Sequence, residues 1–192
     1  MIISKITYFE QSGNSNIDDV IKISLKAAKE LKIKKIVVFS ARMASVLKVK
    51  NTFSDDFDLI IATYSSGRKF LISKDDESEE EIVIPEVATQ TAKNIILNQG
   101  MKYVQGGLPF EPILSCTGDN STEMIVSTFE LILKGLTLCI NGAIMAYENG
   151  YVKEGEQIIS FCCDTSIVVS PTAKRDLFNG NFKIQRILCK PI

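Results

Sequence analysis

Histidine is absent from this chain of 192 residues. Its absence excludes Ser-His and Cys-His catalytic pairs, most zinc sites, and the side chain that most often exchanges protons near neutral pH. The chain also has no excess of either charge, because 22 Lys and Arg are balanced by 23 Asp and Glu. A net charge of −1 gives no overall attraction to nucleic acid or to anionic lipid. We therefore expect neither as a partner.

Long apolar runs are missing as well. No uninterrupted apolar stretch approaches the roughly 20 residues that cross a bilayer. The opening "MIISKITYFEQSG" is a strand-length apolar run followed by polar turn residues, without the cationic start and long apolar middle of a signal peptide. We expect a cytoplasmic protein. Since no internal repeat and no linker interrupt the chain, residues 1–192 are interpreted as one domain.

Cysteines are few, odd in number and without CxxC spacing: Cys116, Cys139, Cys162, Cys163 and Cys189. This pattern indicates reduced, mostly buried thiols. Cys116 lies in a polar loop and is the thiol to test for reactivity. Adjacent residues on a strand face opposite sides, so we expect neither a disulfide nor a shared metal site at Cys162 and Cys163. The sequence also contains no Walker loop, no GxGxxG after a strand and no metal-ligand spacing, and we expect no metal.

Strands and helices alternate along the chain, which predicts a three-layer α/β/α domain with a mostly parallel sheet. Strands are expected at 6–9, 35–40, 58–67, 101–105, 156–162, 165–171 and 183–191. Helices are expected at 17–31, with Asn16 as N-cap, and at 43–50, 85–100, 122–133 and 138–147. The runs 156–162 and 165–171 form either a tight hairpin or one long bent strand. The run 183–191 is a candidate edge strand, and the acidic stretch 74–81 is expected to be a solvated loop or the fraying start of a helix.

Three stretches of the sequence resemble a known family: "ITYFEQSGNSNIDDVIKISLKAAKELKIKKIVVFS", "IIATYSSG" and "DTSIVVSPTAKRDLFNGNFKIQRILCKP". They are similar to small stand-alone proteins that look like the C-terminal α/β domain of pyruvate kinase. The match covers nearly the whole chain in order and is weak at 69–84 and 103–123. It implies a five-stranded mixed sheet in the order 3-2-1-4-5, with the last strand antiparallel.

The resemblance implies binding rather than phosphotransfer, because pyruvate kinase performs its chemistry in another domain. In that enzyme the related domain holds an allosteric sugar phosphate on helix N-termini and hydroxyl-rich loops, and it contributes to subunit contacts. Some stand-alone relatives look like carriers of flavin mononucleotide (FMN) in the equivalent crevice. The resemblance therefore implies FMN as cofactor, and a homo-oligomer is compatible with it.

Individual positions follow the family pattern unevenly. Ser40 and Ser45 match its hydroxyl residues, whereas Met43 replaces its glycine. Thr63-Tyr64-x-x-Gly67 matches well. The family's glycine-rich turn is missing before the matching Asp164 and Thr165, and Asn141 stands where relatives tend to carry a glutamate.

Hydroxyl residues follow two predicted strands, at 35–40 and 58–67, which places them at one edge of a parallel sheet, where open α/β sheets bind ligands. Backbone N–H groups of residues 43–45 would bind a phosphate, with Arg42 or Arg68 as a charged fork and Tyr64 against a planar ring. The predicted cofactor-binding residues are Ser40, Ala41, Arg42, Met43, Ser45, Thr63, Tyr64, Ser66, Gly67, Asp164 and Thr165. The alternative is that Ser45 caps a helix and the others are ordinary loop residues. Asn14-Ser15-Asn16 is a further anion nest in principle, although N-capping explains it.

Three hypotheses for function follow. The first is a binding domain for a phosphate-bearing small molecule such as FMN. The second is a flavin-dependent oxidoreductase, with Tyr64 or Glu111 as proton donor; Glu111 lies between two prolines. The third is an oligomeric interaction module with an eroded pocket, whose interface is the strand 183–190 or the helix 138–147. No catalytic residue is assigned.

Overall fold

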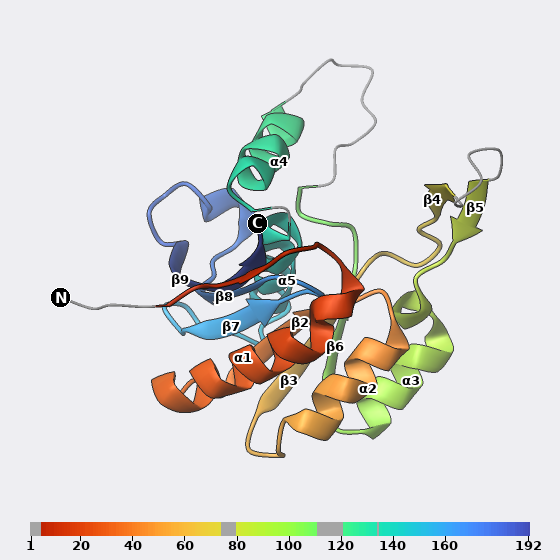
Figure 1. The fold of residues 1–192 in the computed structure, drawn as a ribbon, viewed down its shortest axis with the longest axis horizontal. Coiled ribbons are helices and arrows are strands. Elements are labelled where there is room, and N and C mark those ends of the chain that lie inside the picture. The colour runs from red at the N-terminus through yellow and green to blue at the C-terminus, as the bar shows by residue number, and fades with distance from the viewer. Residues whose placement is uncertain (1–4, 74–79, 111–120, 134) are drawn as a thin grey trace.

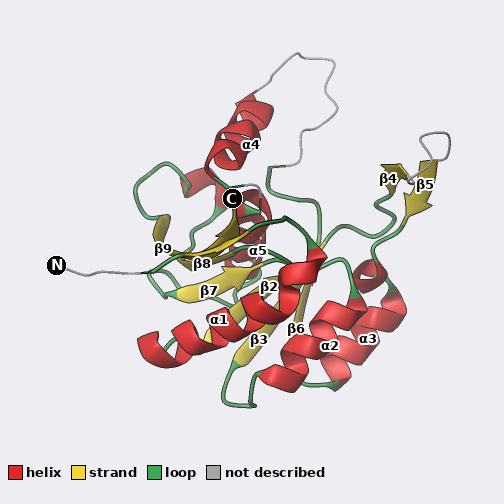
Figure 2. Cartoon of the chain, in the orientation of Figure 1, coloured by secondary structure: helices red, strands yellow, loops and turns green. Residues whose placement is uncertain are grey.

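The computed structural model describes residues 5–73, 80–110, 121–133 and 135–192. Glu111, Cys116 and residues 74–79 of the acidic stretch, on which predictions were made, lie outside the described residues. Figure 1 shows the chain from its N-terminus to its C-terminus, and Figure 2 shows its helices and strands by type.

The main sheet has seven strands in the order β1-β9-β8-β7-β2-β3-β6. Strand β8 is antiparallel to both of its neighbours, and all other neighbouring pairs are parallel. In chain order the strands are β1 (Thr7–Phe9), β2 (Lys35–Phe39), β3 (Asp58–Thr63), β6 (Lys102–Gln105), β7 (Ile158–Phe161), β8 (Ser166–Ser170) and β9 (Lys183–Pro191).

The sheet corrects two predictions. Five strands lie in the expected order β6-β3-β2-β7-β8, with β8 antiparallel, but the count of five is wrong because β9 and β1 extend the sheet. The predicted edge strand β9 is interior, since β1 pairs with its second half from Cys189 to Pro191. The charged residues that suggested an edge are Lys183, Arg186 and Lys190, and Lys183 is exposed at the start of β9, which β1 does not pair.

Helices cover both faces of the sheet, as Figure 1 shows. They are α1 (Ile17–Leu31), α2 (Met43–Thr52), α3 (Gln90–Asn98), α4 (Ser121–Ile132) and α5 (Leu136–Glu148). Successive residues of a strand face opposite sides. Accordingly Val38 packs in the cluster that contains α1, α2 and α3 residues, whereas Val37 packs with α5. The predicted three-layer arrangement is confirmed, and α4 packs on α5 outside the layers.

Smaller elements complete the fold. The runs 156–162 and 165–171 form the hairpin β7–β8, in which the Cys162 N–H donates to the Thr165 carbonyl at 2.9 Å. Strands β4 (Phe70–Ser73) and β5 (Glu80–Val83) form a separate antiparallel pair. The end of the acidic stretch is therefore a strand, neither a loop nor a helix start. Short 3₁₀ turns cover Asn14–Asn16, Glu86–Ala88 and Lys174–Asp176.

In the described part of the chain, no single helix has both the length and the apolar composition to cross a bilayer. Only α4 and α5 taken together, across a bend of 119°, reach that length and composition.

Candidate functional site

The carboxyl ends of β2 and β3 lie side by side, as predicted. The Ser40 N–H donates to the Ala62 carbonyl at 3.0 Å, and the Thr63 hydroxyl donates to the Ser40 carbonyl at 2.8 Å. Strand β2 lies between β3, which follows it in the chain, and β7, which comes much later in the chain. The chain therefore continues from β2 to one side of the sheet and reaches the other side only through β7. This is the switch point where open α/β sheets hold ligands.

A cavity of about 250 Å³, here called the small cavity, opens at this switch point. Five of the predicted residues line it: Ser40, Ala41, Arg42, Ser45 and Tyr64. Its other walls include Asn14 and Ile17 at the start of α1, Leu138 of α5, and Cys162 and Cys163 after β7. Met43 is absent from this lining and packs instead against the core below α1 and α2, so it does not plug the cavity.

A second cavity of about 580 Å³, the large cavity, adjoins the small one, since Tyr64 and Leu138 line both. Its walls carry the aromatic side chains of Phe70 and Phe110 and the cation of Arg68. Helices α4 and α5 complete it with Glu123, Val126, Ser127, Glu130, Thr137 and Asn141. Together the cavities run along the carboxyl edge of the sheet.

Most of the predicted hydroxyls are already hydrogen-bonded within the chain. The Ser40 hydroxyl accepts from the Arg42 N–H and donates to the Arg42 carbonyl, both at 3.1 Å, and so closes the turn after β2. The Ser45 hydroxyl donates to the Asn14 side-chain carbonyl at 3.2 Å. These hydroxyls shape the cavity more than they offer new hydrogen bonds.

The first turn of α2 is also partly occupied. The Met43 N–H, predicted to bind phosphate, donates to a carboxylate oxygen of Glu86 at 2.9 Å. The Val87 N–H donates to the Ala41 carbonyl at 3.2 Å, which holds the segment before α3 across the end of β2. Glu86 is exposed and supplies the negative charge that the N-terminus of α2 favours. A ligand phosphate therefore has to displace or bypass this carboxylate.

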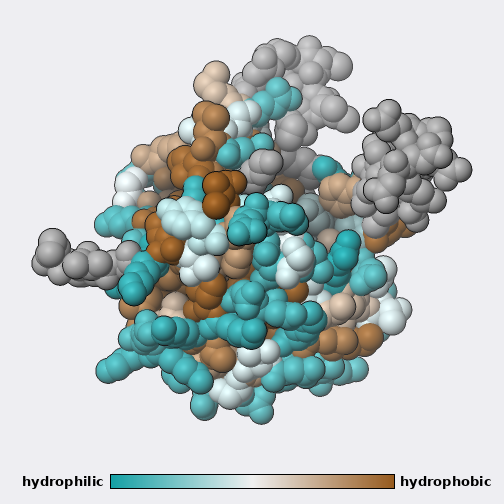
Figure 3. Space-filling model, in the orientation of Figure 1, coloured by the Kyte–Doolittle hydropathy of each residue, from teal (hydrophilic) through white to brown (hydrophobic). Residues whose placement is uncertain are grey.

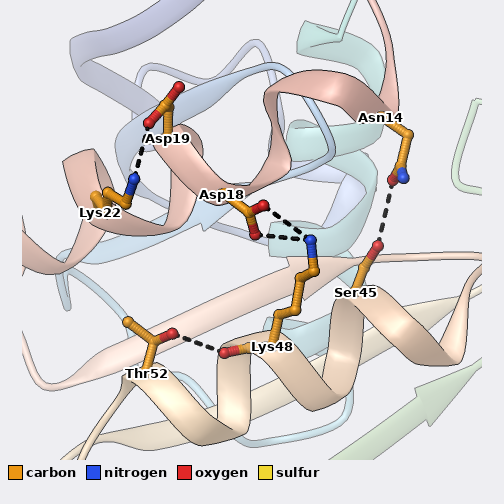
Figure 4. A network of polar contacts seen from close by, with 7 residues as sticks. All are labelled: Asn14, Asp18, Asp19, Lys22, Ser45, Lys48 and Thr52. Carbon is orange, nitrogen blue, oxygen red and sulfur yellow. Dashed lines mark hydrogen bonds and ion pairs between the residues drawn. The ribbon is translucent and has the colours of Figure 1, made fainter.

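Figure 4 shows how α1 and α2 are joined beside the small cavity. Besides the Asn14–Ser45 bond, Lys48 pairs with Asp18 at 2.8 Å. Asn16 occupies the N-cap position of α1, as predicted, but its side chain does not cap the helix and donates to the Gln11 carbonyl at 2.7 Å instead. The helix ends are held in position by these contacts between elements.

Tyr64 lines both cavities where they adjoin. Its ring meets Phe39 edge-on at 4.9 Å and Phe70 at 4.8 Å, and the Arg68 guanidinium lies 5.3 Å from the centre of the Phe70 ring. Burial raises the pKa of Tyr64 to about 12, so the phenol stays protonated at neutral pH. The place of Tyr64 against a planar ring stays a prediction.

Two polar side chains of α5 form an unusual pair. Thr137 and Asn141 are one helical turn apart and only 8% and 0% exposed. The Asn141 carbonyl oxygen accepts from the Phe110 N–H at 3.3 Å. Over the residues that the structure describes, the Thr137 hydroxyl and the Asn141 amide nitrogen have no hydrogen-bond partner. Buried polar atoms are rarely left so, which marks this wall of the large cavity as a place for an added acceptor.

Six predicted site residues line neither cavity: Met43 and Thr63, whose contacts are given above, and Ser66, Gly67, Asp164 and Thr165. Ser66 and Gly67 are the central residues of the turn in which the Arg68 N–H donates to the Ser65 carbonyl at 3.2 Å. Gly67 has φ +78°, the conformation that such a turn demands of its third residue. Asp164 and Thr165 lie buried in the β7–β8 turn.

Asp164 ties the turn to the N-terminal segment. Its carboxylate accepts from the Gly13 N–H at 2.7 Å and from the Thr165 hydroxyl at 3.0 Å. Gly135, which precedes α5, lies so close that an added Cβ would be 2.3 Å from the Thr165 hydroxyl oxygen. Asp164 and Thr165 therefore act as structural supports of the turn beside the small cavity.

The thiols of Cys162 and Cys163 lie on the same side, contrary to prediction. Strand β7 ends at Phe161, so the pair belongs to the turn and does not alternate across a sheet. A hydrogen bond with Cys162, followed by burial, raises the pKa of the Cys163 thiol well above its usual range. None of the four described cysteines forms a disulfide.

The prediction missed Thr137, the thiol pair and the aromatic residues Phe70 and Phe110. The signal for Thr137 and Asn141 is present in "LTLCINGAIMAY", where two polar residues one turn apart interrupt an apolar helix. Known protein-family models contain no match to this chain. The site defines an α/β protein with two adjoining cavities at the carboxyl edge of its sheet.

Proposed function

We propose that the protein binds an elongated small molecule that carries a planar ring and a phosphate group, with FMN as the representative ligand. The observation that carries this proposal is the large cavity with its unpartnered Thr137 and Asn141, continuous at Tyr64 with the small cavity. The resemblance to the C-terminal domain of pyruvate kinase, with the order β6-β3-β2-β7-β8 of five strands, supports the same class of ligand.

The ring belongs in the large cavity. A volume of about 580 Å³ lies within the range of ligand pockets, roughly 300–1,000 Å³. Aromatic side chains give it apolar walls, and the Thr137 hydroxyl and Asn141 amide supply two donors on one side. A flavin ring presents carbonyl oxygens along one edge, which match such donors. Binding would therefore satisfy polar atoms that are otherwise buried without partners.

The phosphate belongs in the small cavity. Helices α1 and α2 both begin at its wall, and the Arg42 side chain lines it. The first turn of α2 contains no acidic residue of its own, and the helix dipole there favours an anion. Glu86, from outside the helix, is the carboxylate that competes with a phosphate for the Met43 N–H. Because Glu86 is exposed, it can turn into water when a phosphate takes its place. Binding of the phosphate in this way requires no metal ion.

Paired titrations with FMN and riboflavin test the proposal. FMN is expected to bind about 10- to 100-fold more tightly than riboflavin, since one charge-assisted contact to phosphate contributes roughly 1.5–3 kcal/mol. Arg42→Gln is expected to remove most of that difference while leaving riboflavin binding unchanged. Lys26→Gln is the matched control, because Lys26 is an exposed cation of α1 that lines neither cavity. Absence of saturable binding of both flavins contradicts the proposal.

A flavin-dependent oxidoreductase is a special case of this proposal. It needs a proton donor near the ring, and Tyr64 lines both cavities. Bleaching of bound FMN by a reduced nicotinamide would distinguish catalysis from simple binding. A bound flavin that no common reductant bleaches would argue against it.

A second candidate function is self-association. Of the interfaces first predicted, α5 is mostly buried within the chain, and β1 covers the end of β9 from Cys189 to Pro191. Instead, Leu131, Ile132 and Ile192 are 88%, 51% and 90% exposed and border one pocket where α4 meets the C-terminus. Figure 3 shows brown, apolar atoms in this region above a mostly hydrophilic lower surface. Sedimentation equilibrium of wild type and Leu131→Glu tests this candidate, and a strictly monomeric wild type removes it.

A further inference from the structure

The β7–β8 turn places three potential metal ligands together. The thiol sulfurs of Cys162 and Cys163 and a carboxylate oxygen of Asp164 all lie within 4.8 Å of one another. The three residues are consecutive, so a single tight turn positions all of them. The expectation of no metal depended on thiols that face opposite ways, and that premise does not hold here.

The separation of the ligand atoms suits a tetrahedral ion. Zinc binds sulfur at about 2.3 Å and oxygen at about 2.1 Å, which at a tetrahedral angle puts the two ligand atoms roughly 3.6 Å apart. The Cys162 sulfur and the Asp164 Oδ1 are 3.6 Å apart. The proton that the Cys162 thiol now directs at this oxygen occupies the direction in which an ion would lie.

Asp164 is held in place independently of any metal. Its Oδ2 accepts from the Gly13 N–H at 2.7 Å, while the Thr165 hydroxyl donates to Oδ1 at 3.0 Å. Such contacts behind a ligand orient it and strengthen metal binding. These two contacts therefore hold the carboxylate in position whether or not an ion is present.

The cluster is also accessible. Cys162 and Cys163 both line the small cavity, and Cys163 is half-buried. An ion has a route to the sulfurs through that cavity. With three ligands from the protein, the fourth coordination position falls to a water or to a ligand atom in the cavity, the arrangement of open zinc sites.

We propose that Cys162, Cys163 and Asp164 form a binding site for a thiophilic divalent cation of the zinc and cadmium class. Two thiolates select such ions over magnesium and calcium, which prefer oxygen ligands. On binding, each thiol exchanges its proton for a bond to the cation, so the two thiols release two protons for each ion bound. The site does not depend on whether the cavities also bind FMN.

Titration with Cd²⁺ tests this site in the reduced, full-length protein. Wild type is expected to bind one equivalent with a near-ultraviolet thiolate-to-cadmium absorption band. Cys163→Ser is expected to weaken binding about tenfold or more, in line with the loss of one ligand, and to reduce the band. Asp164→Asn keeps an acceptor for Gly13 and is expected to weaken binding while retaining both thiolates.

Two controls separate this cluster from other thiols. Cys189→Ser removes a buried thiol outside the cluster, and Cys116→Ser removes one outside the described residues; both are expected to retain the full band. If Cys163→Ser does not fold, a trivalent arsenical, which needs two neighbouring thiols, is expected to block Cd²⁺ binding in wild type. The proposal is overturned by a wild type without the band, by a Cys163→Ser variant with an unchanged band, or by an arsenical that leaves Cd²⁺ binding intact.

Discussion

Substitution of Thr137 by valine removes a buried hydroxyl while keeping the shape and β-branching of the side chain. The Thr137 hydroxyl has no hydrogen-bond partner among the described residues, and the residue is only 8% exposed. An unsatisfied buried polar group costs about 1–3 kcal/mol, whereas an apolar group of the same shape does not. Thr137→Val is therefore expected to raise the free energy of unfolding by about 1 kcal/mol.

Thr63→Val is the matched control. Thr63 is fully buried, and its hydroxyl donates to the Ser40 carbonyl at 2.8 Å. Loss of that hydrogen bond is expected to lower the free energy of unfolding by about 1–2 kcal/mol. The same chemical change thus has opposite effects at two positions of one protein.

Urea unfolding followed by circular dichroism measures both variants, with equal m values as the condition for comparing them. An equal loss of stability in Thr137→Val and Thr63→Val would refute the reasoning, since it would mean that the Thr137 hydroxyl is satisfied. The same Thr137→Val protein is expected to bind FMN more weakly, so stability and binding change in opposite directions.

Three further predictions concern Gly135 beside the site, the Glu156 ion pair at the amino end of β2, and Glu86. Gly135→Ala is expected to lower the free energy of unfolding by about 1–3 kcal/mol, because the added Cβ would overlap Thr165 in the β7–β8 turn. Gly142→Ala is the control: its added Cβ would lie 3.3 Å from the nearest atom, in Val37, and the variant is expected to be near neutral in the same urea assay. Burial opposes ionisation of Glu156, but hydrogen bonds from the Lys153 N–H and Lys35 outweigh it and lower its pKa in the folded state. Its contribution to stability is thus present above the unfolded pKa and lost as pH falls through the folded pKa, and Glu156→Gln is expected to flatten this part of the stability–pH curve. Glu86→Gln is expected to tighten FMN binding severalfold without affecting riboflavin, because it removes the charge that competes for the Met43 N–H; equal changes for both flavins would count against this.

Local pattern was sufficient to predict much of the fold. Helix α1 and the start of α2 were predicted at the observed residues, because apolar spacing and strand composition are local properties. The adjacency of the residues after β2 and β3 followed from the rule that parallel strands end at the same edge. For that reason, five of the predicted residues line the small cavity.

The remaining features depend on contacts between distant segments. Glu86 reaches the Met43 N–H from 43 positions away, and Gly13 binds Asp164 across 151 positions. No local spacing encodes such pairs. The thiol pair was mispredicted for a different reason, since a shift of one residue in the end of β7 moves Cys162 from a strand into a turn.

Mapping of FMN binding by amide chemical shifts tests the central claim most directly. The account predicts that FMN perturbs amides at both ends of the site, near Arg42 and Ser45 in the small cavity and near Thr137 and Asn141 in the large one, with one shared dissociation constant. Riboflavin is expected to perturb the second group more than the first. Perturbations confined to other surfaces, or none at saturating FMN, would contradict the account.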